Sequence, residues 1–183
     1  MSLLAVSPVD GRYAGKTKTL GPYFSEMALI KYRLKTEVEY FIALCELPLP
    51  QLSDISQKEL NAIHSLPDTF SEKDAQAVKD IEKVTNHDVK AVEYFMRDQF
   101  DALGLGQYKE FIHFGLTSQD VNNTAMPMML KEAMVDLVFP QLETILKNLK
   151  ASAEEWKTIP MLARTHGQAA TPTSLGKEFL VFA

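Results

Sequence analysis

The sequence predicts an all-α protein, and three observations support this fold class. Apolar residues recur at steps of three and four along most of the chain, which is the period of a helix that buries one face. No alternation of apolar and polar residues is long enough to predict a β-strand. The chain has 183 residues, of which 46% are hydrophobic and 23% are charged, a composition typical of a globular domain.

The helices of the N-terminal half have recognisable start and stop signals. Ser56 and Glu59 form a capping box that opens a short helix, and Ser71 opens a further one. The prolines that follow Leu47 end the preceding apolar run, because proline cannot continue a helix. The predicted elements are an irregular arm over 1–21 and helices over 22–46, 56–65, 71–84 and 89–100.

One long helix dominates the C-terminal half of the prediction. It has its N-cap at Thr117 or Ser118, runs to about Trp156 and contains two prolines, Pro127 and Pro140. Both prolines are expected to kink it. A last helix begins at Leu175 and stops at Ala183 without a cap. Because a helix end usually carries a stop signal, we expect the chain to be the N-terminal portion of a longer protein.

Composition excludes several classes of partner and compartment. The net charge of −5 argues against nucleic acid as a partner, since binding to phosphates needs clustered Lys and Arg. The single cysteine, Cys45, excludes an internal disulfide framework and fits a reducing compartment. No segment has the features of a signal peptide or of a membrane span. We therefore expect a cytoplasmic protein that acts on a small molecule and not at a membrane.

The segment 164–173 is the most informative part of the sequence. His166 can donate or accept a proton near neutral pH, and Gly167 allows a ligand to approach the backbone. Gln168 and the neighbouring threonines offer neutral hydrogen bonds to carboxylates, and Arg164 offers a charged fork. A site for a polar, anionic ligand beside a proton-transfer group is the interpretation we prefer. The alternative is a surface loop with an incidental histidine.

Other polar clusters stand at predicted helix ends. Asn86, His87 and Asp88 lie at a junction between two helices, where they could bind a ligand or only cap the helices. Thr117 and Ser118 stand at a helix start, which can bind an anion or be a simple N-cap. Together with 164–173, these clusters suggest one composite active site built from distant parts of the chain.

Three weaker candidates complete the set of polar residues. Arg12 and Tyr13 follow a sharp turn and suit phosphate or carboxylate binding with stacking, although a mobile surface arm is the interpretation we favour for the pair taken alone. His113 is expected to be a satisfied, partly buried histidine, and His64 to be solvated. The four histidines are too scattered for a metal site, and no phosphate loop or dinucleotide fingerprint is present, so we expect no cofactor.

Four motifs in their order along the chain resemble the adenylosuccinate lyase family of the fumarase/aspartase superfamily. They are Ser-Pro-Val-Asp-Gly-Arg-Tyr at 7–13, Thr-Asn-His-Asp-Val-Lys-Ala-Val-Glu at 85–93, Phe-Ile-His-Phe at 111–114 with Thr-Ser-Gln-Asp-Val-Asn-Asn at 117–123, and Arg-Thr-His-Gly-Gln at 164–168 with Ala-Thr-Pro at 170–172. The resemblance implies a small helical domain over 1–110, followed by the incomplete start of a long-helix bundle over 111–183. It also implies a homotetramer.

The resemblance further implies a reaction and roles for these residues. The family cleaves a C–N bond by β-elimination, turning adenylosuccinate into AMP and fumarate, and SAICAR into AICAR and fumarate, in purine nucleotide biosynthesis. His166 would be the general acid and His87 a second essential histidine. The substrate would be bound by Arg12, Tyr13, Asn86, Asp88, Thr117, Ser118 and Gln168.

The chain departs from the family's pattern in two respects. Residue 169 is Ala where the family commonly has Pro. The family's general base, a serine on a mobile loop, lies beyond Ala183, so we expect the chain alone to be inactive. The alternatives are another lyase of the superfamily that acts on a succinyl substrate, and a non-catalytic helical module for nucleotide binding or oligomerisation.

Overall fold

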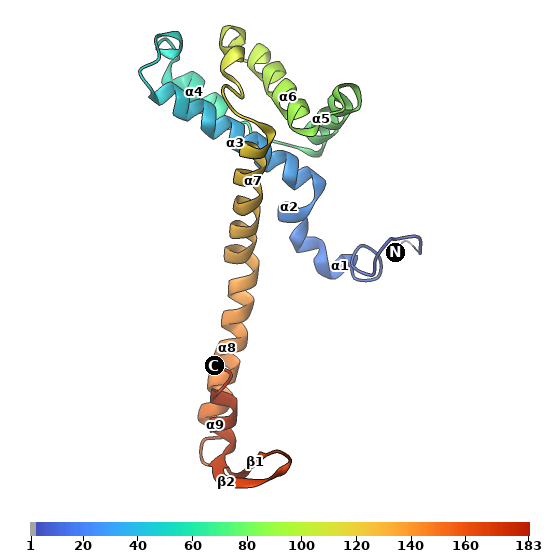
Figure 1. The fold of residues 1–183 in the computed structure, drawn as a ribbon, viewed down its shortest axis with the longest axis vertical. Coiled ribbons are helices and arrows are strands. Elements are labelled where there is room, and N and C mark those ends of the chain that lie inside the picture. Colours follow the sequence, from blue (N-terminus) through green and yellow to red (C-terminus); the bar gives the residue numbers. More distant parts are fainter. Residues whose placement is uncertain (1–2) are drawn as a thin grey trace. The chain divides into compact units, whose positions relative to one another are not determined.

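The computed structural model describes residues 3–183 and confirms the all-α prediction, apart from one small β-hairpin (Figure 1). Short helical turns replace much of the predicted irregular arm. The α-helices are α1 Ala14–Thr17, α2 Gly21–Phe24, α3 Glu26–Glu46, α4 Gln57–His64, α5 Glu72–Thr85, α6 Asp88–Ala102, α7 Ser118–Ala133, α8 Phe139–Glu155 and α9 Leu175–Leu180. The other elements are the 3-10 turns Lys18–Leu20, Pro50–Leu52 and Gly106–Phe111, the π-helix Met134–Val138, and strands β1 Pro160–Thr165 and β2 Gln168–Ser174.

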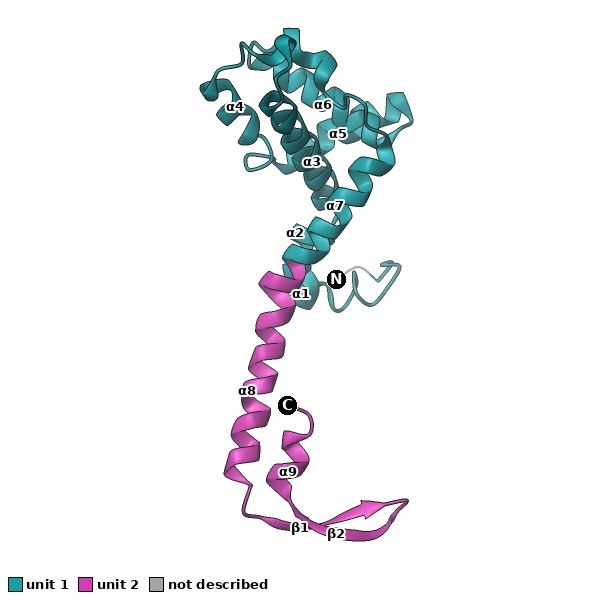
Figure 2. Cartoon of the chain, turned by 60° about the vertical axis from the view of Figure 1, so that its left-hand side comes forward, with its two compact units in different colours: residues 1–132 teal, residues 133–183 magenta. Residues whose placement is uncertain are grey.

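The chain divides into two compact units, Met1–Glu132 and Ala133–Ala183 (Figure 2). The core of the first unit is built on α3, whose Leu34, Val38 and Phe41 are completely buried. Phe41 packs edge-on against Phe100 of α6, with the ring centroids 4.9 Å apart, a favourable arrangement for aromatic rings. The core therefore fixes α3 against α6, which begins beside His87.

The single helix predicted over 22–46 is wrong at its N-terminal end. Ser25 has an extended backbone (ψ 164°), and its hydroxyl accepts a hydrogen bond from the Ala28 amide at 3.1 Å. Serine competes for backbone donors in this way at a helix start, so it ends α2 and caps α3 although the apolar pattern continues through it. The predicted capping box at Ser56 is present, and a second one is formed by Ser71 and Asp74.

Cys45 in the first unit matches its prediction. Cys45 is partly buried against the apolar core, and this burial raises the pKa of its thiol to about 11. It behaves as a small hydrophobic residue. No helix in the described part of the chain has both the length and the apolar character that a membrane span requires.

The second unit differs from the prediction in two places. The long helix expected from 118 to 156 changes to a π-helix over Met134–Val138 before α8 begins. Pro140 lies in the first turn of α8, where its missing N–H does least harm. The polar segment after α8 forms an antiparallel hairpin in which Thr165 pairs with Gln168.

Helix α9 packs closely against the end of α8. The ring of Phe179 meets Trp156 edge-on with centroids 4.8 Å apart, and the Gly176 amide donates to the Trp156 carbonyl at 3.1 Å. A Cβ at Gly176 would lie 2.2 Å from the Ala153 carbonyl oxygen. Glycine is therefore required here by the close approach of two backbones.

We predict that Gly176→Ala lowers the free energy of unfolding by about 1–3 kcal/mol, the usual cost of forcing an atom into a packed contact. Urea unfolding followed by the fluorescence of Trp156, the only tryptophan, measures it. Gly15→Ala is the matched control, because nothing lies within 4 Å of the place in α1 where its Cβ would stand. A Gly176→Ala protein as stable as the parent would contradict the close contact.

Candidate active site

His87 stands at the junction between α5 and α6. Asn86 ends α5 in the left-handed region (φ 52°), which asparagine tolerates better than most residues. His87 then begins α6 as its N-cap, and its Nδ1 accepts a hydrogen bond from the Lys90 amide at 3.1 Å. Because Nδ1 is an acceptor here, the ring proton lies on Nε2, the nitrogen that faces Ser118.

Ser118 brings the start of α7 to the same place. Its Oγ lies 3.4 Å from His87 Nε2, although the two residues are 31 positions apart. Thr117 occupies the N-cap position, and its amide and hydroxyl both donate to Asp120 Oδ2, at 2.7 and 2.8 Å. These two bonds lower the pKa of Asp120. Both donors of Thr117 are thus occupied by Asp120, and Ser118 faces the histidine.

Arg33 of α3 ties these two segments together. Its Nη2 lies 2.6 Å from Asp88 Oδ2, and its Nε donates to Asn122 Oδ1 at 2.9 Å. Burial alone would raise the pKa of Asp88, but the Val89 amide and the Arg33 guanidinium outweigh it and lower the pKa. Asp88 Oδ1 is 3.7 Å from His87 Nδ1, so its main partner is Arg33 and not the adjacent histidine.

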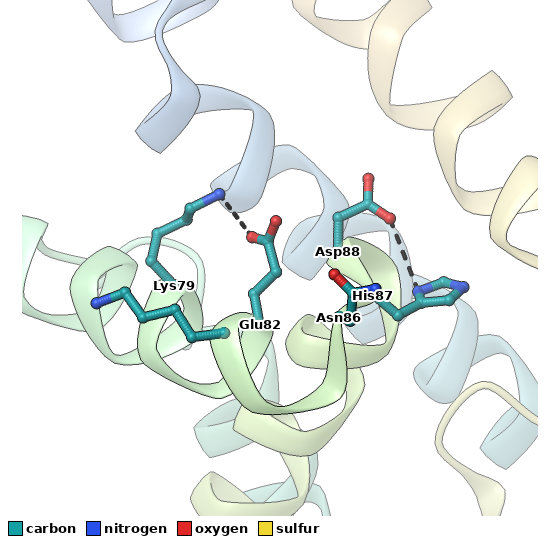
Figure 3. Close-up of a pocket in the computed structure, with 6 residues that line it drawn as sticks. Lys79, Glu82, Asn86, His87 and Asp88 are labelled. Atoms are coloured by element: carbon teal, nitrogen blue, oxygen red, sulfur yellow. Dashed lines mark ion pairs between the residues drawn. The ribbon is translucent and has the colours of Figure 1, made fainter.

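Two hollows open beside His87. One of about 570 Å³ is lined by Lys79, Glu82, Lys83, Asn86, His87 and Asp88 (Figure 3). The other, of about 360 Å³, is lined by His87, Lys90, Glu93, His113, Leu116, Thr117 and Ser118. Both hollows combine His87 with lysines and carboxylates, and the second adds the hydroxyls of Thr117 and Ser118. Such a lining can hold a polar ligand beside a group that exchanges protons.

Arg12 and Tyr13 lie apart from these hollows, in the N-terminal arm. The predicted turn before them is present, because the Gly11 amide donates to the Ser7 carbonyl at 3.0 Å and the Ser7 hydroxyl to Asp10 at 2.7 Å. The Arg12 guanidinium stacks 4.8 Å from the centre of the Tyr13 ring. The pair is exposed, and neither residue lines a hollow beside His87. Its substrate-binding role stays a prediction.

His166 lies at the tip of the hairpin in the second unit. His166 and Gly167 form its two-residue turn and both have positive φ, 51° and 76°, as a type I′ turn requires. The side chains of His166 and Gln168 are exposed. His87 and His166 thus belong to different units, and the composite site that would unite them stays a prediction.

The prediction from sequence missed that three charged residues near His87 are buried. Arg33 and Glu37 lie on the apolar face of α3, and Glu93 on that of α6, each with no more than 5% of its surface exposed. The signal was available, because a charged residue at a core position of a helix needs a buried partner. His113 was predicted to be satisfied and partly buried, and its bond to Glu37 confirms this. Across residues 3–183 no three His, Cys, Asp or Glu side chains gather as a metal site.

Known lyases resemble this chain over most of its length. A protein family described as lyase matches residues 11–183. The chain belongs to this lyase family. Among curated members, adenylosuccinate lyase of Dictyostelium discoideum is 51% identical over 195 residues, which cover 99% of this chain and 40% of that protein. Adenylosuccinate lyase of Vibrio cholerae is 44% identical over 97% of this chain and 39% of its own length.

A solved lyase structure has the same fold. The crystal structure of fumarate lyase from Mesorhizobium sp. BNC1 matches 90% of this chain and 36% of its own chain, with a TM-score of 0.67 and 22% identity. At this identity the likeness concerns the fold alone. The chain spans about 40% of the length of the curated lyases it matches.

We predict that Arg33→Gln lowers the free energy of unfolding by about 1–3 kcal/mol at pH 7, because Asp88 and Asn122 lose a shared partner. Because folding lowers the pKa of Asp88, its ionised carboxylate stabilises the fold at pH values above its usual pKa of 3.8. This stability is lost as the pH falls through the folded-state pKa. Urea unfolding at pH 7 and pH 3 should therefore show a smaller penalty in acid. Lys83→Gln, which breaks an exposed pair with Asp80, is the control. Equal penalties for Arg33→Gln at both pH values would contradict the assignment to Asp88.

Proposed function

We propose that a protein carrying this chain is an adenylosuccinate lyase. It cleaves adenylosuccinate to AMP and fumarate, and SAICAR to AICAR and fumarate, in purine nucleotide biosynthesis. The observation that carries the proposal is the likeness of almost the whole chain to curated adenylosuccinate lyases, up to 51% identical. The convergence of His87 and Ser118 on a shared hollow supports it, since such a site suits an anionic substrate.

The proposed reaction is a β-elimination with no cofactor. A base removes the proton beside a substrate carboxylate, the negative charge spreads onto that carboxylate, and the C–N bond breaks as an acid protonates the departing nitrogen. His166 is the proposed acid, because an imidazole near neutral pH can supply this proton. Hydroxyl and amide donors stabilise the charge on the carboxylate, a role we propose for Thr117, Ser118 and Gln168.

The nucleotide part of the substrate needs separate contacts. We propose that Arg12 and Tyr13 bind it by charge and stacking, which their own stacked geometry supports. Asn86, His87 and Asp88 form the other wall of the pocket. The left-handed backbone of Asn86 and the Arg33–Asp88 pair hold His87 there, which supports a positioning role for its two neighbours.

The general base is proposed to lie outside this chain, on a serine-bearing loop. Because the chain spans about 40% of the length of its relatives, we propose that it is inactive alone. The proposed domains are 1–110 and 111–183. A segment with two left-handed residues, His113 and Gly115, separates the last 3-10 turn from α7 and supports a boundary near there.

The active enzyme is proposed to be a cytoplasmic homotetramer. Exposed apolar residues on α8 support association, since a free apolar patch is a common interaction site. About half of the surface of Leu142 and of Ile145 is exposed, while Leu149 is half-buried. With Phe182 these residues line an apolar hollow of about 410 Å³ within the second unit.

A chimera tests the proposed activity. In it, this chain replaces the matching 40% of the Dictyostelium discoideum enzyme, which supplies the remaining length. We expect the chimera to release fumarate from adenylosuccinate, measured by absorbance, and the 183-residue chain alone to release none. A folded chimera without activity would reject the lyase proposal. Binding of AMP to the chain alone, measured by calorimetry, would then favour the nucleotide-binding module.

In the chimera, His166→Gln is expected to lower kcat by at least about 100-fold, the usual contribution of a general acid. His64→Gln is the matched control, because this histidine is exposed, lies in the first unit and pairs with the exposed Glu39 at 3.3 Å. Unchanged kcat in His166→Gln would remove His166 from the reaction without removing the lyase activity itself.

A further inference from the structure

Glu37 and His113 form a buried pair beside the hollow that His87 lines. Glu37 Oε1 lies 2.5 Å from His113 Nδ1, although the residues are 76 positions apart. The Glu37 side chain is completely buried and that of His113 is 16% exposed. His113 also lines the hollow of about 360 Å³, together with His87 and Ser118. The pair thus connects the core of the first unit to this hollow.

The backbone around His113 is held in place as well. His113 has a left-handed conformation (φ 59°), which few residues adopt without support. The hydroxyl of Tyr40, one turn along α3 from Glu37, donates to the Phe114 carbonyl at 2.7 Å. Helix α3 therefore holds both the ring of His113 and the backbone carbonyl of the next residue, Phe114.

Charged groups from several elements surround the pair. Burial raises the pKa of Glu37, and the bond to His113 opposes this rise without cancelling it. Nearby Glu93 of α6 also raises the pKa, but Glu93 is itself neutralised by Lys90 at 2.6 Å and Arg97 at 3.3 Å. On the side of α7, the exposed Asp120 favours a positive charge on His113. Glu37 Oε2 is buried and has no partner among residues 3–183, so His113 is what balances its charge.

We propose that Glu37 is a positioning residue that holds His113 as an imidazolium at the wall of the hollow, with its Nε2–H directed to an oxygen of the anionic substrate. The identity of that substrate is taken from the proposed function, on which this proposal therefore rests. Nδ1 is occupied by Glu37, and Nε2 has no hydrogen-bond partner among residues 3–183. A ring fixed on one nitrogen by a carboxylate has its tautomer and its orientation set for the other nitrogen.

The state of the ring can be measured on the 183-residue chain without any activity. Nitrogen-15 NMR of the histidine rings distinguishes the protonated ring from each neutral tautomer. We expect the Nδ1 of His113 to carry a proton that faces Glu37. The ring of His64, whose partner Glu39 is an exposed glutamate on the same helix as Glu37, is the comparison. A neutral His113 at pH 7 with a bare Nδ1 would overturn the proposal, since Glu37 would then carry the proton.

The effect on catalysis is measured in the chimera. Glu37→Gln keeps the size of the side chain and removes its charge. We expect kcat/KM for adenylosuccinate to fall about 10- to 100-fold, as when a charge-assisted hydrogen bond becomes neutral. The acid limb of the pH profile of kcat/KM should also shift. A variant that only lost stability would not show this shift. Glu39→Gln is the matched control and should leave both unchanged.

The possible failures are distinguishable. An inactive parent chimera rejects the proposed function, whereas the NMR result on the chain still decides the state of the Glu37–His113 pair. An active parent with unchanged rate and pH profile in Glu37→Gln rejects the positioning role alone. If Glu37→Gln does not fold, the NMR titration of the unaltered chain remains decisive.

Discussion

A buried guanidinium is the constraint on which the arrangement around His87 depends. Arg33 lies on the core face of α3, where water cannot solvate it, so its donors must find acceptors within the protein. It finds them in Asp88 and Asn122, one in the first turn of α6 and one in α7. Because the guanidinium is planar and its donors are fixed in direction, two helix starts far apart in sequence are oriented by one side chain.

The fold was predictable wherever its signals were local. Capping boxes act within four residues, and the 3.6-residue period is written along each helix, so most helices were placed correctly from sequence. The break at Ser25 was missed because the apolar pattern runs through it, while the competing serine hydroxyl is a single residue. The hairpin was missed for another reason. Both strands are mostly exposed on both faces, so no apolar alternation marks them, and only the His166–Gly167 turn could have revealed the hairpin.

The exposed residues of the candidate site could be predicted from the sequence, but the buried residues that hold them in place could not. Asn86, His87, Thr117 and Ser118 stand out because polar residues cluster at helix ends. Their partners do not stand out, since Arg33 and Glu37 look like interruptions of an apolar stripe. The bond from Glu37 to His113 spans 76 residues, and no local pattern encodes a contact at that separation. Buried charges on a helix's core face are therefore the residues to pair first when no structure is available.

Position 166 has two requirements, the backbone conformation of the hairpin turn and the proton transfer that we propose for His166. Position 166 needs a left-handed backbone, which Asn, Asp and His adopt more readily than other residues with side chains. Among these, only His exchanges a proton near neutral pH without a large shift of its pKa. Asn or Gly at this position would keep the turn and lose the proton transfer that we propose for His166. The residue at the tip would then distinguish working members of the family from inert ones whose folds are otherwise the same.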